Sequence, residues 1–279
     1  MSEPIGAHNL SLTLPPIGVF DSGLGGLSVW REVVKLLPNH SIIYVSDNAY
    51  CPYGPRPVEV LIKRTQEISR FLIEQGCALI VVACNTATAA AIDHLRSAFP
   101  LPFVGMEPAV KPAALHSKTG VVGILATRGT FQGRLYQETS HRFAAHIRVI
   151  EQIGDGLVEL VEQGLAHSPE ALQLLHTYID PMIEAGADHL VLGCTHYPFL
   201  IPVIEQISQG RMTIIDPAPA VAQQVCAVWE QRDKVDYLVD TPPIYRFYTT
   251  GSEDALRACY DSLAPPLSAA VFFPFFRFS

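Results

Sequence analysis

Two of the six cysteines, Cys84 and Cys194, are candidate catalytic residues. Each ends an apolar run and is followed directly by polar side chains, which are Asn85-Thr86 and Thr195-His196. A thiol with an ordinary pKa of about 8.5 is a usable base when ionised and a usable acid when protonated. One thiolate could take the α-hydrogen from one face of an amino acid while the other thiol returns a proton to the opposite face. The reverse reaction needs the same two groups with exchanged protonation, so a matched pair favours racemisation.

The apolar runs that carry these cysteines belong to a repeated strand-helix pattern, which is typical of a parallel sheet covered by helices. The predicted strands are Ile17–Phe20, Ser41–Val45, Ala78–Ala83, Phe103–Val104, Gly120–Leu125, Ile147–Ile150, His189–Leu192 and Met212–Ile215. The predicted helices are Leu27–Leu37, Val58–Gln75, Thr86–Ala98, Ala171–Ala185 and Ala220–Trp229, with Pro38 and Gly76 as stops. In such a sheet ligands bind beyond the carboxyl ends of the strands, where both cysteines fall. The helix starts that follow them would favour a thiolate over a thiol.

An internal repeat relates the two halves of the chain. The run from Ile17 to Gly23 is echoed from Val122 to Gly129, and Leu79–Thr86 is echoed by His189–His196. The pattern predicts two pseudo-symmetric α/β domains that each contribute one cysteine to the cleft between them. Prolines after Glu107 and Asp216 suggest boundaries, which gives a first domain of residues 15–107 plus 216–279, a second of 108–215, and an N-terminal extension of 1–14.

The loop Asp21-Ser22-Gly23-Leu24-Gly25-Gly26 follows a strand and opens a helix. It is not a dinucleotide fingerprint, because Ser28 occupies the third glycine position, and it lacks the Walker Gly-Lys-Ser/Thr. Its glycines would instead let the backbone approach a small ligand. Asp21 is either a helix N-cap or an assistant to Cys84.

Two further segments have both a structural and a functional interpretation. The turn Cys51-Pro52-Tyr53-Gly54-Pro55 is a surface loop or a rigid wall whose backbone N–H groups at Tyr53 or Gly54 meet a carboxylate. His196, two residues after Cys194, is a structural histidine or a proton relay to that thiol.

Composition restricts the kind of partner. The formal charge is −8, with 19 Lys and Arg scattered among 27 acidic residues, which disfavours nucleic acid. There is neither a secretory signal pattern at the start nor an apolar run long enough for a membrane span, so we expect a soluble, cytoplasmic protein. Its cysteines then remain reduced, and Cys77, Cys226 and Cys259 are expected to be small buried hydrophobes.

With these residues assembled, the chain resembles the glutamate racemases of the aspartate/glutamate racemase superfamily. The resemblance rests on Gly18–Gly26, Pro52-Tyr53-Gly54, Ala83–Ala87 and Gly193–Pro198, which are widely spaced and specific in combination. It implies flavodoxin-like or Rossmann-like domains, no cofactor and no metal, and two-base conversion of L-glutamate to D-glutamate for peptidoglycan synthesis in bacteria. Carried over by motif, Cys84 and Cys194 are the proton-transfer pair, and the substrate contacts are Asp21, Ser22, Tyr53, Gly54, Asn85, Thr86, Thr195 and His196.

The resemblance also implies an assistant to Cys194 in a Val-Glu-x-Gly segment, which Val161–Gly164 matches and which makes Glu162 a candidate. Nearby Glu159 and Glu151 compete with it for this role. Extensions like the one before Pro15 accompany activation by a peptidoglycan precursor in some relatives, so such an activator is one expectation for this chain. A homodimer is another. The aromatic tail from Ala264 to Ser279 matches nothing in the family pattern; it packs on the fold, mediates association or is peculiar to this chain.

Three alternatives remain. A related two-cysteine racemase for aspartate, a hydantoin or another carboxylate would share the proton chemistry, although the Pro-Tyr-Gly and Thr-His-Tyr-Pro segments favour glutamate. A cysteine-nucleophile hydrolase would need one activated thiol, a base and an oxyanion hole, and gives no reason for the second cysteine. A non-catalytic binding protein with two α/β lobes would bind a ligand without exchanging its α-hydrogen.

Overall fold

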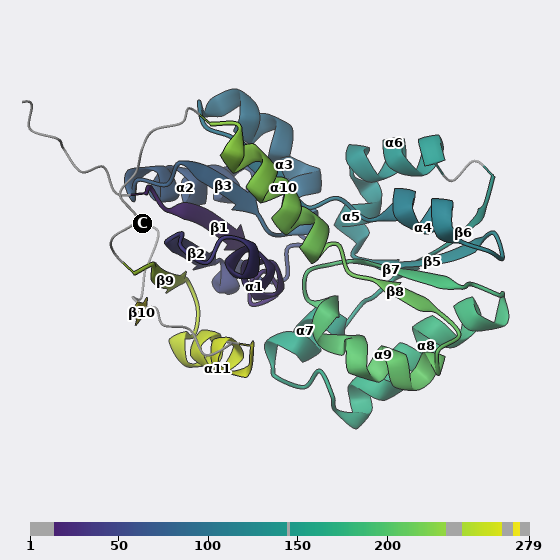
Figure 1. Cartoon of the computed structure of the whole chain (residues 1–279). Helices are drawn as coiled ribbons and strands as arrows, with labels where there is room; N and C mark the ends of the chain where they lie inside the picture. The colour runs from purple at the N-terminus through teal and green to yellow at the C-terminus, as the bar shows by residue number, and fades with distance from the viewer. Residues whose placement is uncertain (1–13, 144–145, 233–241, 264–269, 274–279) are drawn as a thin grey trace, which may run out of the picture.

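A computed structural model of the chain describes residues 14–143, 146–232, 242–263 and 270–273. Within these ranges the strands form two sheets, in which every pair is parallel. The first has the order β10-β9-β2-β1-β3-β4 and the second β6-β5-β7-β8 (Figure 1). The strands are β1 (Ile17–Asp21), β2 (Ile42–Ser46), β3 (Leu79–Val82), β4 (Phe103–Gly105), β5 (Val121–Ala126), β6 (Arg148–Ile153), β7 (His189–Gly193), β8 (Thr213–Ile215), β9 (Ile244–Thr249) and β10 (Ala270–Phe272).

The order β2-β1-β3-β4 in the first sheet corresponds strand for strand to β6-β5-β7-β8 in the second. The echoed segments therefore occupy equivalent places: β1 and β5 lie at equivalent central positions, and β3 and β7, which precede the two cysteines, are their neighbours. The predicted α/β class with two parallel sheets is confirmed.

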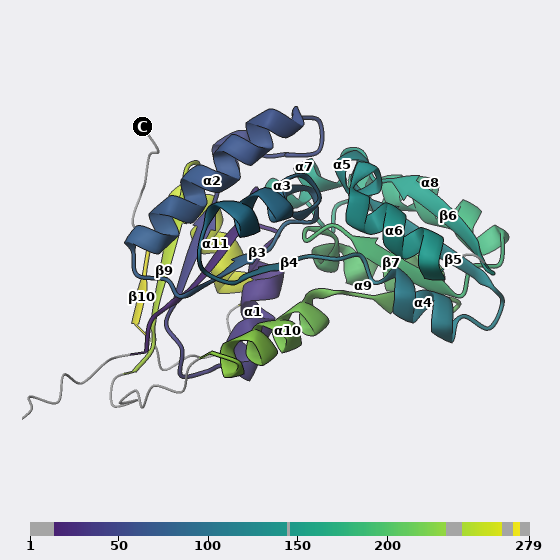
Figure 2. The same cartoon turned by 90° about the horizontal axis from the view of Figure 1, so that it is seen from above.

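The central strands are buried on both faces, which is why they read as continuous apolar runs. On β1, Ile17 and Val19 face the core formed with α1 (Leu27–Leu36), α10 (Ala218–Glu230) and α11 (Glu253–Leu263). Phe20 faces the opposite core, formed with α2 (Val58–Glu74) and α3 (Asn85–Ala98). Figure 2 shows these helices on the two sides of the first sheet.

The second sheet is sandwiched in the same way (Figure 1). One face carries α4 (Val110–His116), α5 (Arg128–Gln132) and α6 (Arg134–Phe143), and the other α7 (Leu157–Glu162), α8 (Pro169–Glu184) and α9 (Ile201–Ser208). Two short 3-10 helices, η1 (Asn48–Tyr50) and η2 (Tyr197–Leu200), follow β2 and β7.

All eight predicted strands and all five predicted helices are confirmed, with ends shifted by at most two residues, except that β6 runs three residues further, to Ile153. The sequence prediction missed β9, β10, the short helices α4 to α7, α9 and α11. Part of the aromatic tail packs on the fold, because β10 pairs with β9 and Phe273 stacks on Phe247 with ring centroids 5.2 Å apart. The predicted extension 1–14 lies outside the described residues except for its last position. No helix in the described ranges is long and apolar enough to cross a membrane.

Candidate active site

Cys84 lies where β3 ends and α3 begins. Its backbone is the N-cap of α3, and its sulfur accepts a hydrogen bond from the Ala87 N–H at 3.4 Å. The thiol also lies 3.7 Å from the Ser22 hydroxyl, because β1 and β3 are neighbours in the sheet. Burial, followed by the charge of Asp21, raises the pKa of the Cys84 thiol despite the amide and the hydroxyl. The amide at the helix start lowers the pKa, as expected, but burial and the charge of Asp21 outweigh it.

Cys194 lies at the equivalent place after β7 and is linked to a buried histidine. Its sulfur is 3.8 Å from Nδ1 of His196, whose Nε2 donates to Oε1 of Glu162 at 2.6 Å. Burial alone would lower the pKa of His196, but hydrogen bonds with Cys194, Cys51 and Glu162 raise it well above its ordinary value. Burial acts to raise the pKa of Glu162, but hydrogen bonds outweigh it, the one from His196 most of all, so the pKa is lowered. The pair therefore favours an imidazolium and a carboxylate.

The two thiols line one pocket between the sheets. Its lining residues are Ser22, Pro52, Tyr53, Gly54, Cys84, Asn85, Thr86, Thr127, Val158, Cys194, Thr195 and His196. Seven of the eight predicted substrate contacts are in this set, and the eighth, Asp21, is fully buried outside it. A water-sized sphere can occupy only about 10 Å³ within the pocket, which is room for about one water molecule. A space of this size does not hold an amino acid.

Asp21 lies under the glycine loop and connects the two halves. Its carboxylate accepts from the N–H groups of Gly23 at 3.0 Å and Gly26 at 3.1 Å, and from the Thr195 hydroxyl at 3.2 Å. Burial raises the pKa of this carboxyl. The described contacts include none to Cys84, so Asp21 acts on that thiol through its charge and through the loop that it orders.

Glu162, which belongs to the second half, also connects the two halves. Besides His196, it accepts from the Leu24 N–H at 2.7 Å and from the Asn48 side-chain amide. The approach is close: a Cβ at position 23 would lie 2.0 Å from Glu162 Oε1, so Gly23 cannot be replaced without displacing this carboxylate. Glu159 and Glu151, the competing candidates, are exposed, and the structure brings only Glu162 to His196.

A buried ion pair that the sequence prediction missed holds the wall of the pocket. Asp47 is fully buried and accepts from Arg64 at 2.6 and 3.0 Å, from the Tyr53 hydroxyl at 2.6 Å and from the Thr250 hydroxyl at 3.0 Å. Burial, followed by the charge of Asp47, raises the pKa of Tyr53 well above its ordinary value, so the phenol remains a donor. No local spacing signals a pair 17 positions apart, which meets only when helix α2 packs beside the end of β2.

Two other polar side chains distinguish the pocket. The Asn85 amide is buried, and neither its nitrogen nor its oxygen has a hydrogen-bond partner in the described structure. An unpaired buried amide costs about 1–3 kcal/mol, so a ligand that pairs it would gain binding energy. Thr127, which the sequence prediction also missed, bonds the Thr86 hydroxyl at 2.8 Å. It occupies the position that Ser22 has in the first half, so the repeat could have revealed it.

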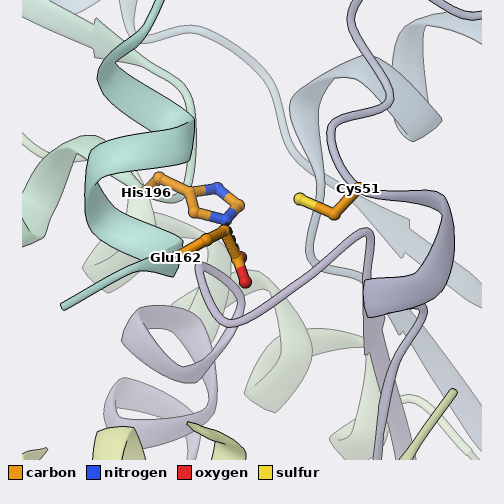
Figure 3. Close-up of side chains that lie close together, drawn as sticks. All are labelled: Cys51, Glu162 and His196. Carbon is orange, nitrogen blue, oxygen red and sulfur yellow. Dashed lines mark hydrogen bonds and ion pairs between the residues drawn. The ribbon is translucent and has the colours of Figure 1, made fainter. Parts of the chain in front are cut away.

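Among the described residues, one group of side chains could hold a metal ion. The ligand atoms of Cys51, Glu162 and His196 all lie within 4.8 Å of one another (Figure 3). Burial raises the pKa of the Cys51 thiol to about 11.

Comparison with known proteins identifies the family of the chain. The model of the Asp/Glu/Hydantoin racemase family matches residues 17–225. A glutamate racemase of Roseiflexus sp. is 50% identical over 218 residues, which is 78% of this chain and 80% of that protein. The crystal structure of the Escherichia coli glutamate racemase with L-glutamate and the activator UDP-MurNAc-Ala has a TM-score of 0.80 at 32% identity, covering 93% of this chain and 98% of the other. The Francisella tularensis glutamate racemase with D-glutamate has a TM-score of 0.79 at 28% identity, covering 95% and 98%. The chain therefore belongs to the Asp/Glu/Hydantoin racemase family, among its glutamate racemases.

Proposed function

We propose that the protein interconverts L- and D-glutamate without a cofactor, with Cys84 and Cys194 as opposed acid and base. The observation that carries the proposal is that both thiols line one pocket between two equivalent half-sites. In one direction a thiolate takes the Cα hydrogen as a proton, and the electron pair stays on the planar carbanion. The opposite thiol then gives its proton to the other face, which leaves the two sulfurs with exchanged protonation.

The surrounding residues have distinct roles in this proposal. Glu162 and His196 hold or move a proton at Cys194, since Nδ1 of His196 faces that sulfur. Asp21 orders the glycine loop beside Cys84 and holds Thr195. The remaining predicted contacts bind the substrate: Ser22, Tyr53, Gly54, Asn85, Thr86, Thr195 and His196. The unpaired Asn85 amide supports this most directly.

Opening of the cleft is part of the proposal. The half-sites would belong to domains 15–107 plus 216–279 and 108–215, which share the small closed pocket. Glutamate would bind when these domains separate, and their closure would exclude water and bring the thiols to opposite faces of Cα.

The physiological part of the proposal is that D-glutamate made in the cytoplasm supplies peptidoglycan synthesis. The Escherichia coli relative was crystallised with UDP-MurNAc-Ala as its activator, so we propose a peptidoglycan precursor as an activator here. A cavity of about 780 Å³ away from the thiols supports an anionic ligand, because Arg96, Lys111 and Arg142 line it together with Glu107. A homodimer remains a prediction.

The test uses purified, cofactor-free protein with L-glutamate in heavy water. Loss of optical rotation, with one deuterium entering the product at Cα, is expected. Turnover that appears only after pyridoxal phosphate is added would contradict the proposal.

Alanine variants separate the alternatives. Both Cys84→Ala and Cys194→Ala should abolish racemisation, whereas Cys226→Ala, on the outer helix α10, should not. A hydrolase would need only one of the pocket thiols. Parallel assays with aspartate and a hydantoin establish whether glutamate is the preferred substrate.

A further inference from the structure

We propose that Cys51, Glu162 and His196 form a binding site for a zinc-like divalent cation, and that its occupancy inhibits the enzyme. The three side chains come from separate elements: Cys51 follows η1, Glu162 ends α7 and His196 precedes η2. They point toward one another (Figure 3), and their ligand atoms lie within 4.8 Å.

The donor set suits zinc. Thiolate, imidazole and carboxylate are its usual protein ligands, and three of them with an open fourth position make a common zinc arrangement. Zinc–ligand bonds of about 2.0–2.3 Å in tetrahedral geometry place ligand atoms about 3.4–3.6 Å apart. The widest separation here, up to 4.8 Å, would shrink by about 1 Å, and the 2.6 Å contact between His196 and Glu162 would widen by about as much. Side-chain rotations supply movements of this size.

The groups behind the ligands are already arranged as in a metal site. The Leu24 N–H and the Asn48 amide hold the Glu162 carboxylate, and Nδ1 of His196, the nitrogen not facing Glu162, is directed to Cys194. Such outer partners fix ligand orientation and commonly contribute to metal affinity. Gly23 leaves the space beside Glu162 and Cys51 open, since its absent Cβ would lie 2.0 Å from one and 3.0 Å from the other.

Inhibition follows from the protons that the cation replaces. Binding would release the Cys51 thiol proton and the proton that His196 Nε2 shares with Glu162 to the solvent. The imidazole would then keep its remaining proton on Nδ1, facing Cys194, and could no longer exchange protons with Glu162. The predicted inhibition rests on the proposed function of Cys194, whereas the predicted binding of zinc does not.

The binding experiment uses the full chain, stripped with a chelator and equilibrated with zinc in a metal buffer. The expected result is one zinc per chain by elemental analysis. Cys51→Ala should weaken zinc affinity by more than the roughly 10- to 100-fold typical of losing an outer partner, and Asn48→Ala should weaken it within that range. Cys226→Ala and the inactive Cys84→Ala should retain it.

Two further measurements distinguish loss of the metal ligand from loss of the fold. Cys51→Ser keeps the side-chain size but replaces the soft ligand, and it should lose zinc while melting like the wild type. Cobalt bound to the wild type should show charge transfer from one thiolate. Absence of stoichiometric zinc, full affinity in Cys51→Ser, or loss of binding in Cys84→Ala would overturn the proposal; the last result would place the metal on the opposed thiols.

Activity is measured separately. Zinc should lower wild-type racemisation, and chelator should restore it, while the fraction of activity remaining at saturating zinc should be much larger in Cys51→Ser. Saturated binding without inhibition would refute the regulatory part alone. A protein that binds zinc but does not racemise glutamate would instead refute the proposed function.

Discussion

Replacing Glu162 by Gln tests the proposed proton path to Cys194 most directly. The substitution keeps the size of the side chain but removes the charge that accepts the 2.6 Å hydrogen bond from His196. Hydrogen bonds to charged groups are worth about 1.5–3 kcal/mol, and those between neutral groups about 0.5–1.5 kcal/mol. If the transition state loses about 1–1.5 kcal/mol of stabilisation, kcat/KM falls by about tenfold. Glu159→Gln, on the same helix but exposed, is the matched control and should leave it unchanged.

Circular dichroism from each enantiomer, with α-hydrogen and α-deuterium substrates, measures the effect. The equilibrium constant between enantiomers is 1 in an achiral solvent, so kcat/KM must fall equally in both directions. The isotope effect should rise only for the enantiomer whose hydrogen Cys194 removes, because only that abstraction becomes slower. For the other enantiomer, slow proton donation from Cys194 should reduce the substrate isotope effect. Equal isotope changes for both enantiomers, or an equal loss in Glu159→Gln, would refute the reasoning.

Three further predictions concern stability and binding. Arg64→Met should destabilise the fold by about 3–5 kcal/mol in urea denaturation because it leaves buried Asp47 uncompensated, and adding Asp47→Leu should recover much of the loss; additive losses would contradict this. Asn85→Leu should raise the glutamate KM by about tenfold or more without lowering the melting temperature of the free protein, since the amide is unpaired there; an unchanged KM would count against Asn85 as a contact. Burial acts to raise the pKa of Asp188, but hydrogen bonds led by those of His189 and Ser117 hold it well below its ordinary value. A lowered folded pKa stabilises above the unfolded value of about 3.9, and this contribution is lost as pH falls. The melting temperature of Asp188→Asn should therefore lie below that of the wild type at pH 7 and approach it in acid, and a gap that does not narrow would refute this assignment.

Much of the fold could be predicted because the central strands are buried on both faces. Runs such as Leu79–Val82 and His189–Gly193 are apolar at nearly every position, and this pattern does not depend on distant contacts. The missed β9 lies outside β2 and alternates buried with half-buried residues, including Arg246, so its apolar signal is weaker. The six-residue helix α7 is too short for a clear helical period.

The sequence by itself determined where the two pocket cysteines lie along the chain. Parallel strands align their carboxyl ends, so a polar residue after each apolar run is enough to place Cys84 and Cys194 at the binding edge of each sheet. The internal repeat further indicated that the two edges are equivalent.

Only the tertiary structure decided which groups meet across the cleft and in what electrostatic state. The contacts of Glu162 with Leu24 and Asn48 join segments more than 110 positions apart, and no local pattern encodes them. The helix start after Cys84 suggested a thiolate, yet burial and the nearby charge of Asp21 raise its pKa. Desolvation and charge separation depend on three-dimensional distance, which local sequence spacing does not specify.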